Sequence, residues 1–226
     1  MRAEGFDRYA VYFTPDGALA RAGAAWLGWD VAQGSAVAHP DLGAVDLAGI
    51  TATPRKYGMH GTLKPPFVLA QGTDAEELRI AVHALAEGLT PVSLAGLEVA
   101  ALGPFLALKP VGDQTGLARL AAEVVTQLDR FRASPSEAEL ARRRQSNLSA
   151  AQERHLRDWG YPYVMDQFRF HITLTGRLSR AQEVEIAPVA RAYFALYLTT
   201  PFVIGSLTLA GQGTDGMFYE IERIRL

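Results

Sequence analysis

Two histidine–threonine pairs of identical spacing are the residues most able to do chemistry. His60 and Thr62 lie in the segment YGMHGTLKPPF, and His171 and Thr173 lie in FRFHITLTG. Side chains two residues apart on a β-strand point to the same face, so each histidine should share a face with its threonine. A neutral imidazole can accept a proton and a protonated one can donate it, while hydroxyls can stabilise developing oxyanions. The two motifs therefore predict acid–base chemistry at a phosphodiester, without a metal.

Three cations are expected to hold the phosphate. Strand parity places Lys64 on the face of His60 and Arg169 on the face of His171, although Pro65 and Pro66 weaken the expectation for Lys64, since prolines mark strand ends and bulges. Arg143 is the third, in an RRR run on an expected helix. The run is either a solvated helix face or part of a lid in which Arg143 reaches a second phosphate.

Composition narrows the functional class. The chain has 226 residues, a net charge of −2 and no cysteine, which excludes thiolate chemistry and disulfides and disfavours a general nucleic-acid or membrane binder. Two histidines without a matched carboxylate are a poor metal-ligand set, so neither metal nor cofactor is expected. No run is apolar enough for a signal peptide or membrane helix, which makes a cytoplasmic protein with a small phosphorylated substrate the default expectation.

Hydrophobic periodicity and turn residues predict an alternation of strands and helices. The expected strands cover residues 8–13, 91–102, 105–110 and 201–210, and the expected helices cover residues 18–28, 74–87, 115–132 and 179–198. Residues 30–54 read as a loop with one short element, and WGYPYV (residues 159–164) reads as a packed turn or as a surface that stacks on a base or sugar.

The second half of the sequence repeats the first. Pro91 aligns with Pro201 at an offset of 110 residues, and His60 aligns with His171 at an offset of 111. A duplication of this length favours two lobes related by a pseudo-two-fold axis. We therefore expect a bilobal α+β fold in which two antiparallel sheets flank a central cleft.

The expected boundaries follow from the same alignment. Lobe one covers about residues 14–110 and lobe two about residues 111–226, with the strand at residues 8–13 shared. Residues of about 134–160 have no counterpart in the first half, so they are expected to form a helical insertion.

Paired H-x-T-L motifs in a duplicated α+β chain resemble the two-histidine (2H) phosphoesterase superfamily, which includes RNA 2′,5′ ligase-like proteins and cyclic phosphodiesterases. YGMHGTLKPPF, ELARRR, WGYPYV and FRFHITLTGRL are similar, more specifically, to 2H-like proteins encoded with bacterial phosphonate-utilisation operons. The resemblance covers nearly the whole chain, including the insertion. It implies a metal-independent site in which His60, Thr62, His171 and Thr173 are the catalytic elements.

The expected function is the opening of a cyclic phosphodiester on a small ribose-containing substrate. Two alternatives stay open: an RNA-end phosphodiesterase acting on 2′,3′-cyclic or 2′,5′-linked ends, and a non-catalytic accessory protein that binds phosphorylated ligands. The sequence leaves open which histidine is the acid, whether hydrolysis or ligation is favoured, and the oligomeric state.

Overall fold

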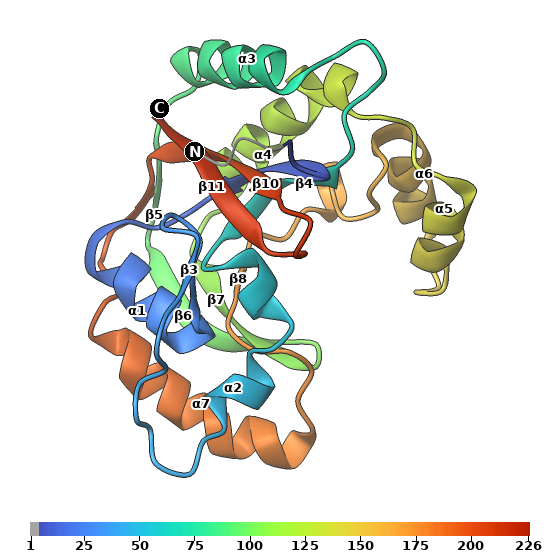
Figure 1. The fold of residues 1–226 in the computed structure, drawn as a ribbon. Helices are drawn as coiled ribbons and strands as arrows, with labels where there is room; N and C mark the ends of the chain where they lie inside the picture. Colours follow the sequence, from blue (N-terminus) through green and yellow to red (C-terminus); the bar gives the residue numbers. More distant parts are fainter. Residues whose placement is uncertain (1–4) are drawn as a thin grey trace.

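The protein, seen here in a computed structural model that describes residues 5–226, has a mixed α+β fold with a large antiparallel sheet (Figure 1), which confirms the predicted class. The helices are α1 (Gly17–Leu27), α2 (Leu47–Ile50), α3 (Ala75–Glu87), α4 (Thr115–Gln127), α5 (Glu137–Arg144), α6 (Ala150–Trp159) and α7 (Arg180–Ala195). The strands are β1 (Arg8–Phe13), β2 (Trp29–Asp30), β3 (Ser35–Ala36), β4 (Gly61–Phe67), β5 (Val92–Leu94), β6 (Gly96–Leu102), β7 (Phe105–Val111), β8 (Ile172–Thr173), β9 (Phe202–Ile204), β10 (Ser206–Gln212) and β11 (Phe218–Arg225).

The main sheet is continuous, whereas two separate sheets were expected. Within the described residues its seven strands run in the order β11-β10-β1-β4-β8-β7-β6. The two sides meet between β4 and β8, which pair through Gly61 and Ile172 alone. Because β8 is only two residues long, the junction is narrow. The expected two sheets are thus two sides of one sheet, joined at the segments that carry the histidines.

The strand register supports the duplication inferred from the sequence. Gly61 and Ile172, the central residues of the two H-x-T motifs, lie opposite each other. In the small β5–β9 sheet, Ser93 lies opposite Val203, again at the offset of the repeat. When a residue pairs antiparallel with its own counterpart, a local two-fold axis passes between them. Both pairs therefore lie on the pseudo-two-fold axis of the molecule.

The sides of the sheet draw on both halves of the sequence. The final strand common to both repeats, β6 in the first and β10 in the second, pairs with the first strand of the other repeat. Strand β6 thus pairs with β7, and β10 pairs with β1. Strand β7 followed by α4 then corresponds to β1 followed by α1, which places the repeat boundary at the turn of Gly103 and Pro104. This turn is close to the predicted lobe boundary near residue 110, and the lobe ranges themselves stay a prediction.

Helices cover the sheet toward both ends of the molecule. In Figure 1, α3 and α4 lie toward one end, and α1, α2 and α7 lie toward the other. Helix α4 contacts β4, α3 contacts β10 and β11, and α7 contacts β6 and β7. Their apolar faces form the core, which includes Leu78, Val82, Leu120, Val124 and Phe194. The predicted helices at residues 115–132 and 179–198 end earlier, at Gln127 and Ala195.

Helices α5 and α6 occupy the expected insertion and stand to one side of the body (Figure 1). Helix α5 has no buried residue and α6 buries only Leu156. Their starts are set by side-chain caps, Ser136 on α5 and a Ser149–Gln152 capping box on α6. None of the helices in the part of the chain described is both long and apolar enough to cross a membrane.

Candidate active site

The two H-x-T motifs face each other across the centre of the sheet. His60 directly precedes β4 and His171 directly precedes β8, and their neighbours Gly61 and Ile172 form the antiparallel pair that joins the two sides. Extending this register by one residue each way places His60 opposite Thr173 and Thr62 opposite His171. Directly opposed residues have Cβ atoms about 4.5–5.5 Å apart. This register predicts that each imidazole lies near the threonine of the other motif, in agreement with the walls of two adjoining pockets: Thr62 and His171 line one, and His60 and Thr173 line the other.

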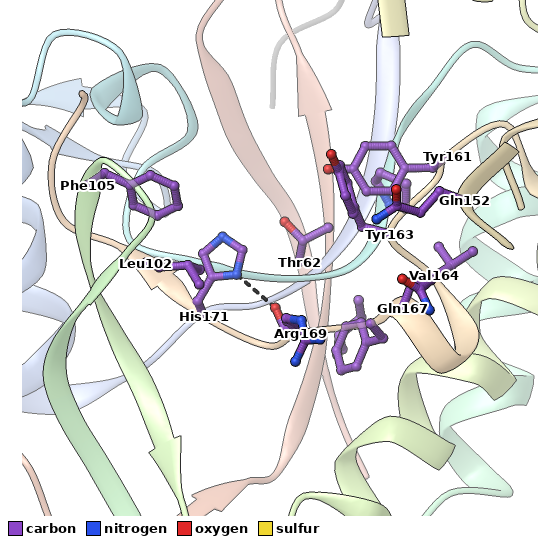
Figure 2. A pocket seen from close by; sticks show the side chains of 13 residues that line it. Thr62, Leu102, Phe105, Gln152, Tyr161, Tyr163, Val164, Gln167, Arg169 and His171 are labelled. Atoms are coloured by element: carbon purple, nitrogen blue, oxygen red, sulfur yellow. Dashed lines mark hydrogen bonds between the residues drawn. The ribbon is translucent and has the colours of Figure 1, made fainter. Parts of the chain in front are cut away.

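Both imidazoles are oriented in the same way by the backbone. Nδ1 of His60 donates to the carbonyl oxygen of Gly58 at 2.9 Å, and Nδ1 of His171 donates to that of Arg169 at 2.8 Å. Because a carbonyl can only accept, each of these bonds assigns the ring proton to Nδ1. Nε2 is then the basic nitrogen of each neutral ring. Figure 2 shows the His171 ring held by this bond, beside Thr62.

Two glycines let the chain adopt this arrangement around His60. Gly58 has φ of +70°, in the region that side-chain-bearing residues avoid, and its carbonyl is the one that orients His60. At Gly61 a Cβ would lie 2.2 Å from Cζ of Phe170. The ring of Phe170 therefore packs directly on the backbone of the opposing motif, which brings β4 and β8 together.

Burial lowers the pKa of both histidines. Burial lowers the pKa of His60 to about 4, the hydrogen bond to Gly58 opposes this shift, and the charge of His171 adds to it. The pKa of His171 is also lowered, again mainly by burial. The pKa of His60 is the more strongly displaced of the two.

The histidines line two ends of one groove. His60, Thr62 and Thr173 line an end of about 770 Å³, and His171 and Thr62 line an end of about 470 Å³. The two ends share four wall residues, which are Thr62, Pro65, Phe105 and Tyr161. All four predicted catalytic residues thus border two adjoining hollows with a common wall, which are here called the two ends of the groove. Figure 2 shows the His171 end between Phe105 and the two tyrosines of the WGYPYV segment.

The prediction that Lys64 binds phosphate is wrong in this structure. Its side chain is 2% exposed, and Nζ donates to the carbonyl oxygen of Val125 at 3.0 Å and to Asp129 at 3.3 Å. Burial lowers its pKa to about 8, and Asp129 partly opposes this. The cause is a β-bulge: Val11 pairs with Lys64 but Tyr12 with Thr62, so the parity that relates Lys64 to His60 is broken.

The other two predicted cations do reach the groove. Arg169 is exposed and lines the His171 end, on the same side as its histidine (Figure 2). Arg143 lines the His60 end, together with Arg142. Arg144 instead forms an ion pair with Glu153 at 2.7 Å. The helix therefore presents two of its three arginines to the groove, and the alternative of a wholly solvated face does not hold.

Several groove residues were not expected from the sequence. Tyr12 is fully buried, with its ring centroid 4.2 Å from that of His60. Tyr57 lies 5.7 Å from the same imidazole, and Phe105 lies 5.7 Å from His171. Tyr161 borders both ends of the groove. Aromatic residues enclose the imidazoles, which explains their desolvation; their positions depend on tertiary packing, and only the WGYPYV segment indicated any of them.

The remaining three histidines have hydrogen-bond partners elsewhere in the structure. His39 contacts backbone carbonyls of Ala25 and Trp26, His83 contacts Glu222, and His155 contacts Asp166. Within residues 5–226, no group of three or more histidine, aspartate or glutamate side chains is arranged to hold a metal ion.

Comparison with known proteins gives a family. A family model described as "Protein of unknown function (DUF1045)" matches residues 62–219. Two curated proteins named ribose 1,5-bisphosphate phosphokinase PhnN are similar: that of Janthinobacterium sp. (strain Marseille) is 37% identical over 99% of this chain and 52% of its own length, and that of Laribacter hongkongensis (strain HLHK9) is 36% identical over 84% and 45%. The chain thus spans about half the length of these relatives.

Two solved structures are similar over nearly their whole length. One is described as a phosphoesterase, with 16% identity, a TM-score of 0.46 and 98% of both chains covered. The other is E. coli LigT complexed with NADP+, with 13% identity, a TM-score of 0.46 and 99% of both chains covered.

Proposed function

The chain belongs to the DUF1045 family, and we propose that it is a two-histidine phosphoesterase that opens a cyclic phosphodiester on a small ribose phosphate. The observation that carries the proposal is the matched orientation of the imidazoles. Each has Nδ1 bound to a backbone carbonyl two residues earlier, and each lines the same groove next to a threonine of the opposing motif.

In the proposed reaction the phosphate lies between the two imidazoles. His60, whose pKa of about 4 keeps it neutral, accepts a proton from water at Nε2 as the water oxygen attacks phosphorus. The bond from phosphorus to one ribose oxygen breaks, and Nε2–H of protonated His171 donates its proton to that oxygen. Thr62 and Thr173 donate to the non-bridging oxygens. The product is a ribose phosphomonoester, and no step requires a metal.

The substrate class follows from the relatives. Those that match this chain over half their length are named for a kinase of ribose 1,5-bisphosphate. A phosphorylated ribose is therefore the first substrate to test. This connection also supports the expected link to phosphonate use.

The test is turnover of ribose 1,2-cyclic and nucleoside 2′,3′-cyclic phosphates in the presence of EDTA. We expect the wild type to hydrolyse a ribose cyclic phosphate and each of His60→Ala and His171→Ala to lose about 10²–10⁴-fold in kcat, the usual contribution of an acid or base. Lys64→Met serves as a matched control that removes a motif side chain outside the groove. Absence of turnover in every case would favour the non-catalytic binder, and loss of activity in EDTA would contradict the mechanism.

The RNA-end alternative is weaker. A groove bordered by aromatic side chains could stack on bases, but the net charge of −2 provides no extended basic surface for an RNA backbone. The nucleoside cyclic phosphates in the same panel discriminate between the two substrates.

A further inference from the structure

The two ends of the groove differ in charge. Four arginines from separate parts of the chain line the His60 end: Arg8 on β1, Arg142 and Arg143 on α5, and Arg177 after β8. No carboxylate lines this end among the residues that the structure describes. The concentration of positive charge is local, since the chain as a whole carries −2.

The His171 end is mostly uncharged. Among the described residues, Arg169 is the one arginine, lysine or carboxylate that lines the His171 end. The other lining groups include the amides of Gln152 and Gln167 and apolar side chains such as Leu102 and Phe168. Figure 2 shows both glutamines on the side of the groove away from Phe105. A substrate that fits both ends therefore has one strongly anionic part and one neutral, hydroxyl-bearing or apolar part.

Arg143 is partly buried and incompletely hydrogen-bonded. Its side chain is 19% exposed, Nη2 donates to Glu139 at 2.8 Å, and the guanidinium lies 4.7 Å from the ring centre of Tyr161. Its Nε is buried and has no hydrogen-bond partner in the described part of the chain. A buried unpaired donor is costly, so a bound anion that reorders this side chain can recover that cost.

The number of cations exceeds what the scissile phosphate needs. A cyclic phosphodiester carries a single negative charge, whereas a phosphomonoester carries about −1.5 to −2 at pH 7. Four arginines, of which Arg142 and Arg143 share the single carboxylate of Glu139, match the summed negative charge of the two groups better than that of the diester alone. Bidentate guanidinium contacts are the usual means of binding phosphate.

We propose that the arginine-lined end of the groove is a subsite for a second phosphate, a phosphomonoester on the same sugar that carries the cyclic phosphodiester. This inference rests on the proposed function for the position of the diester between the imidazoles. It specifies the substrate as a doubly phosphorylated sugar, bound with its phosphomonoester at the His60 end and the remainder toward Gln152 and Gln167.

The kinetic test compares ribose 1,2-cyclic phosphate with and without a 5-phosphate. We expect the wild type to favour the 5-phosphorylated compound by at least about 10-fold in kcat/KM. Arg143→Gln and Arg177→Gln should each lower kcat/KM on the 5-phosphorylated compound by about 10- to 100-fold, the effect of losing one charge-assisted hydrogen bond. On ribose 1,2-cyclic phosphate without the 5-phosphate, kcat/KM of the same variants should change by less than about 3-fold.

Arg144→Gln is the matched control, because Arg144 is on the same helix but pairs with Glu153 outside the groove. It should behave as the wild type on both compounds. Arg177 is exposed, so its substitution tests the subsite without a risk to folding. Equal kcat/KM for the two compounds in the wild type would overturn the inference, as would a stronger preference for an oligonucleotide with a 2′,3′-cyclic end.

A binding measurement separates this inference from the proposed function. Ribose 5-phosphate, titrated by calorimetry into a His60→Ala/His171→Ala variant, should bind, and should lose at least about 10-fold in affinity when Arg143→Gln is added. If no cyclic phosphate is hydrolysed but this pattern is seen, the proposed function fails and the subsite stands. If cyclic phosphates are hydrolysed but ribose 5-phosphate does not bind, or binds equally well with Arg143→Gln, the second-phosphate subsite is contradicted and the proposed function is not.

Discussion

His60 and His171 have the same local environment: each ring is half-buried, fixed by one hydrogen bond and packed against an aromatic side chain. One ring nitrogen of each is bound to a backbone carbonyl, and the rings are packed against Tyr12 and Phe105 respectively. Burial opposes protonation while the carbonyl bond favours it, and burial prevails in both. The pair is thus suited to a division of roles in which the ring with the lower pKa is the base.

The pH profile of the free enzyme follows from these two groups. The base must be neutral, so kcat/KM should rise as the pH passes upward through about 4, the pKa of His60. The acid must be protonated, so kcat/KM should fall as the pH passes upward through the pKa of His171, which is below 6.5. We expect a bell with a mildly acidic optimum, measured as kcat/KM on a cyclic phosphate.

A substrate with an activated leaving group provides the control for this profile. A 4-nitrophenyl phosphodiester needs little protonation of its leaving oxygen, so the fall at higher pH should disappear and His171→Ala should be tolerated far better than His60→Ala. A profile that is flat between pH 4 and 7 on cyclic phosphates would count against the two-imidazole mechanism.

Elements outside the sheet complete the groove. Helix α6 carries Gln152 at its first turn and leads into Tyr161, and both line the His171 end. The capping box of Ser149 and Gln152 fixes the start of this helix. Ser179 and Gln182 form the same kind of capping box at the start of α7. Neither Ser179 nor Gln182 lines the groove. Removing each cap in turn therefore distinguishes a loss of helix stability alone from a loss that also disturbs the groove.

We expect Ser149→Ala and Ser179→Ala each to lower the free energy of unfolding by about 1 kcal/mol, the usual loss of an N-cap. Only Ser149→Ala should also raise KM, by a few-fold, because losing the bond from the backbone N–H of Gln152 to Ser149 Oγ loosens the first turn of α6, which carries Gln152. Denaturant unfolding and steady-state kinetics measure the two effects. Equal KM values in both variants would show that α6 does not position the groove wall.

In the molecule as a whole, the junction of β4 and β8 sets the relative positions of the two H-x-T motifs. The two sides of the sheet are linked there through one residue pair, Gly61 and Ile172, and by the packing of Phe170 on Gly61. Each motif supplies a histidine to the groove and a threonine next to the opposing histidine. A change in the separation of the two sides would therefore displace all four groups together.

Gly61→Ala tests this dependence. The added Cβ would lie 2.2 Å from Phe170, so we expect a loss of about 1–3 kcal/mol in the free energy of unfolding, typical of overpacking, and a fall in kcat beyond that of a surface change. Gly205→Ala is the control, because its nearest atom would be at 3.7 Å. If the two variants unfold at the same denaturant concentration, the close contact across the junction is not a constraint.

Local sequence was sufficient for the features that depend on short spacing. The two H-x-T motifs could be recognised because i and i+2 share a face wherever a strand forms. The α+β class and the repeat were also readable, since both are periodic properties of the chain. The catalytic roles of the motif residues stay a prediction.

Tertiary structure decided which faces meet. Lys64 was misplaced because the bulge opposite Val11 exists only in the pairing of β4 with β1. Pro65 and Pro66 indicated an irregular strand, but they did not show which residue would change face. The choice of Arg142 and Arg143 over Arg144 depends on how α5 is set against the body. The aromatic enclosure by Tyr12, Tyr57 and Phe105 and the asymmetry of charge along the groove arise likewise from segments distant in sequence, whose contacts are fixed by packing.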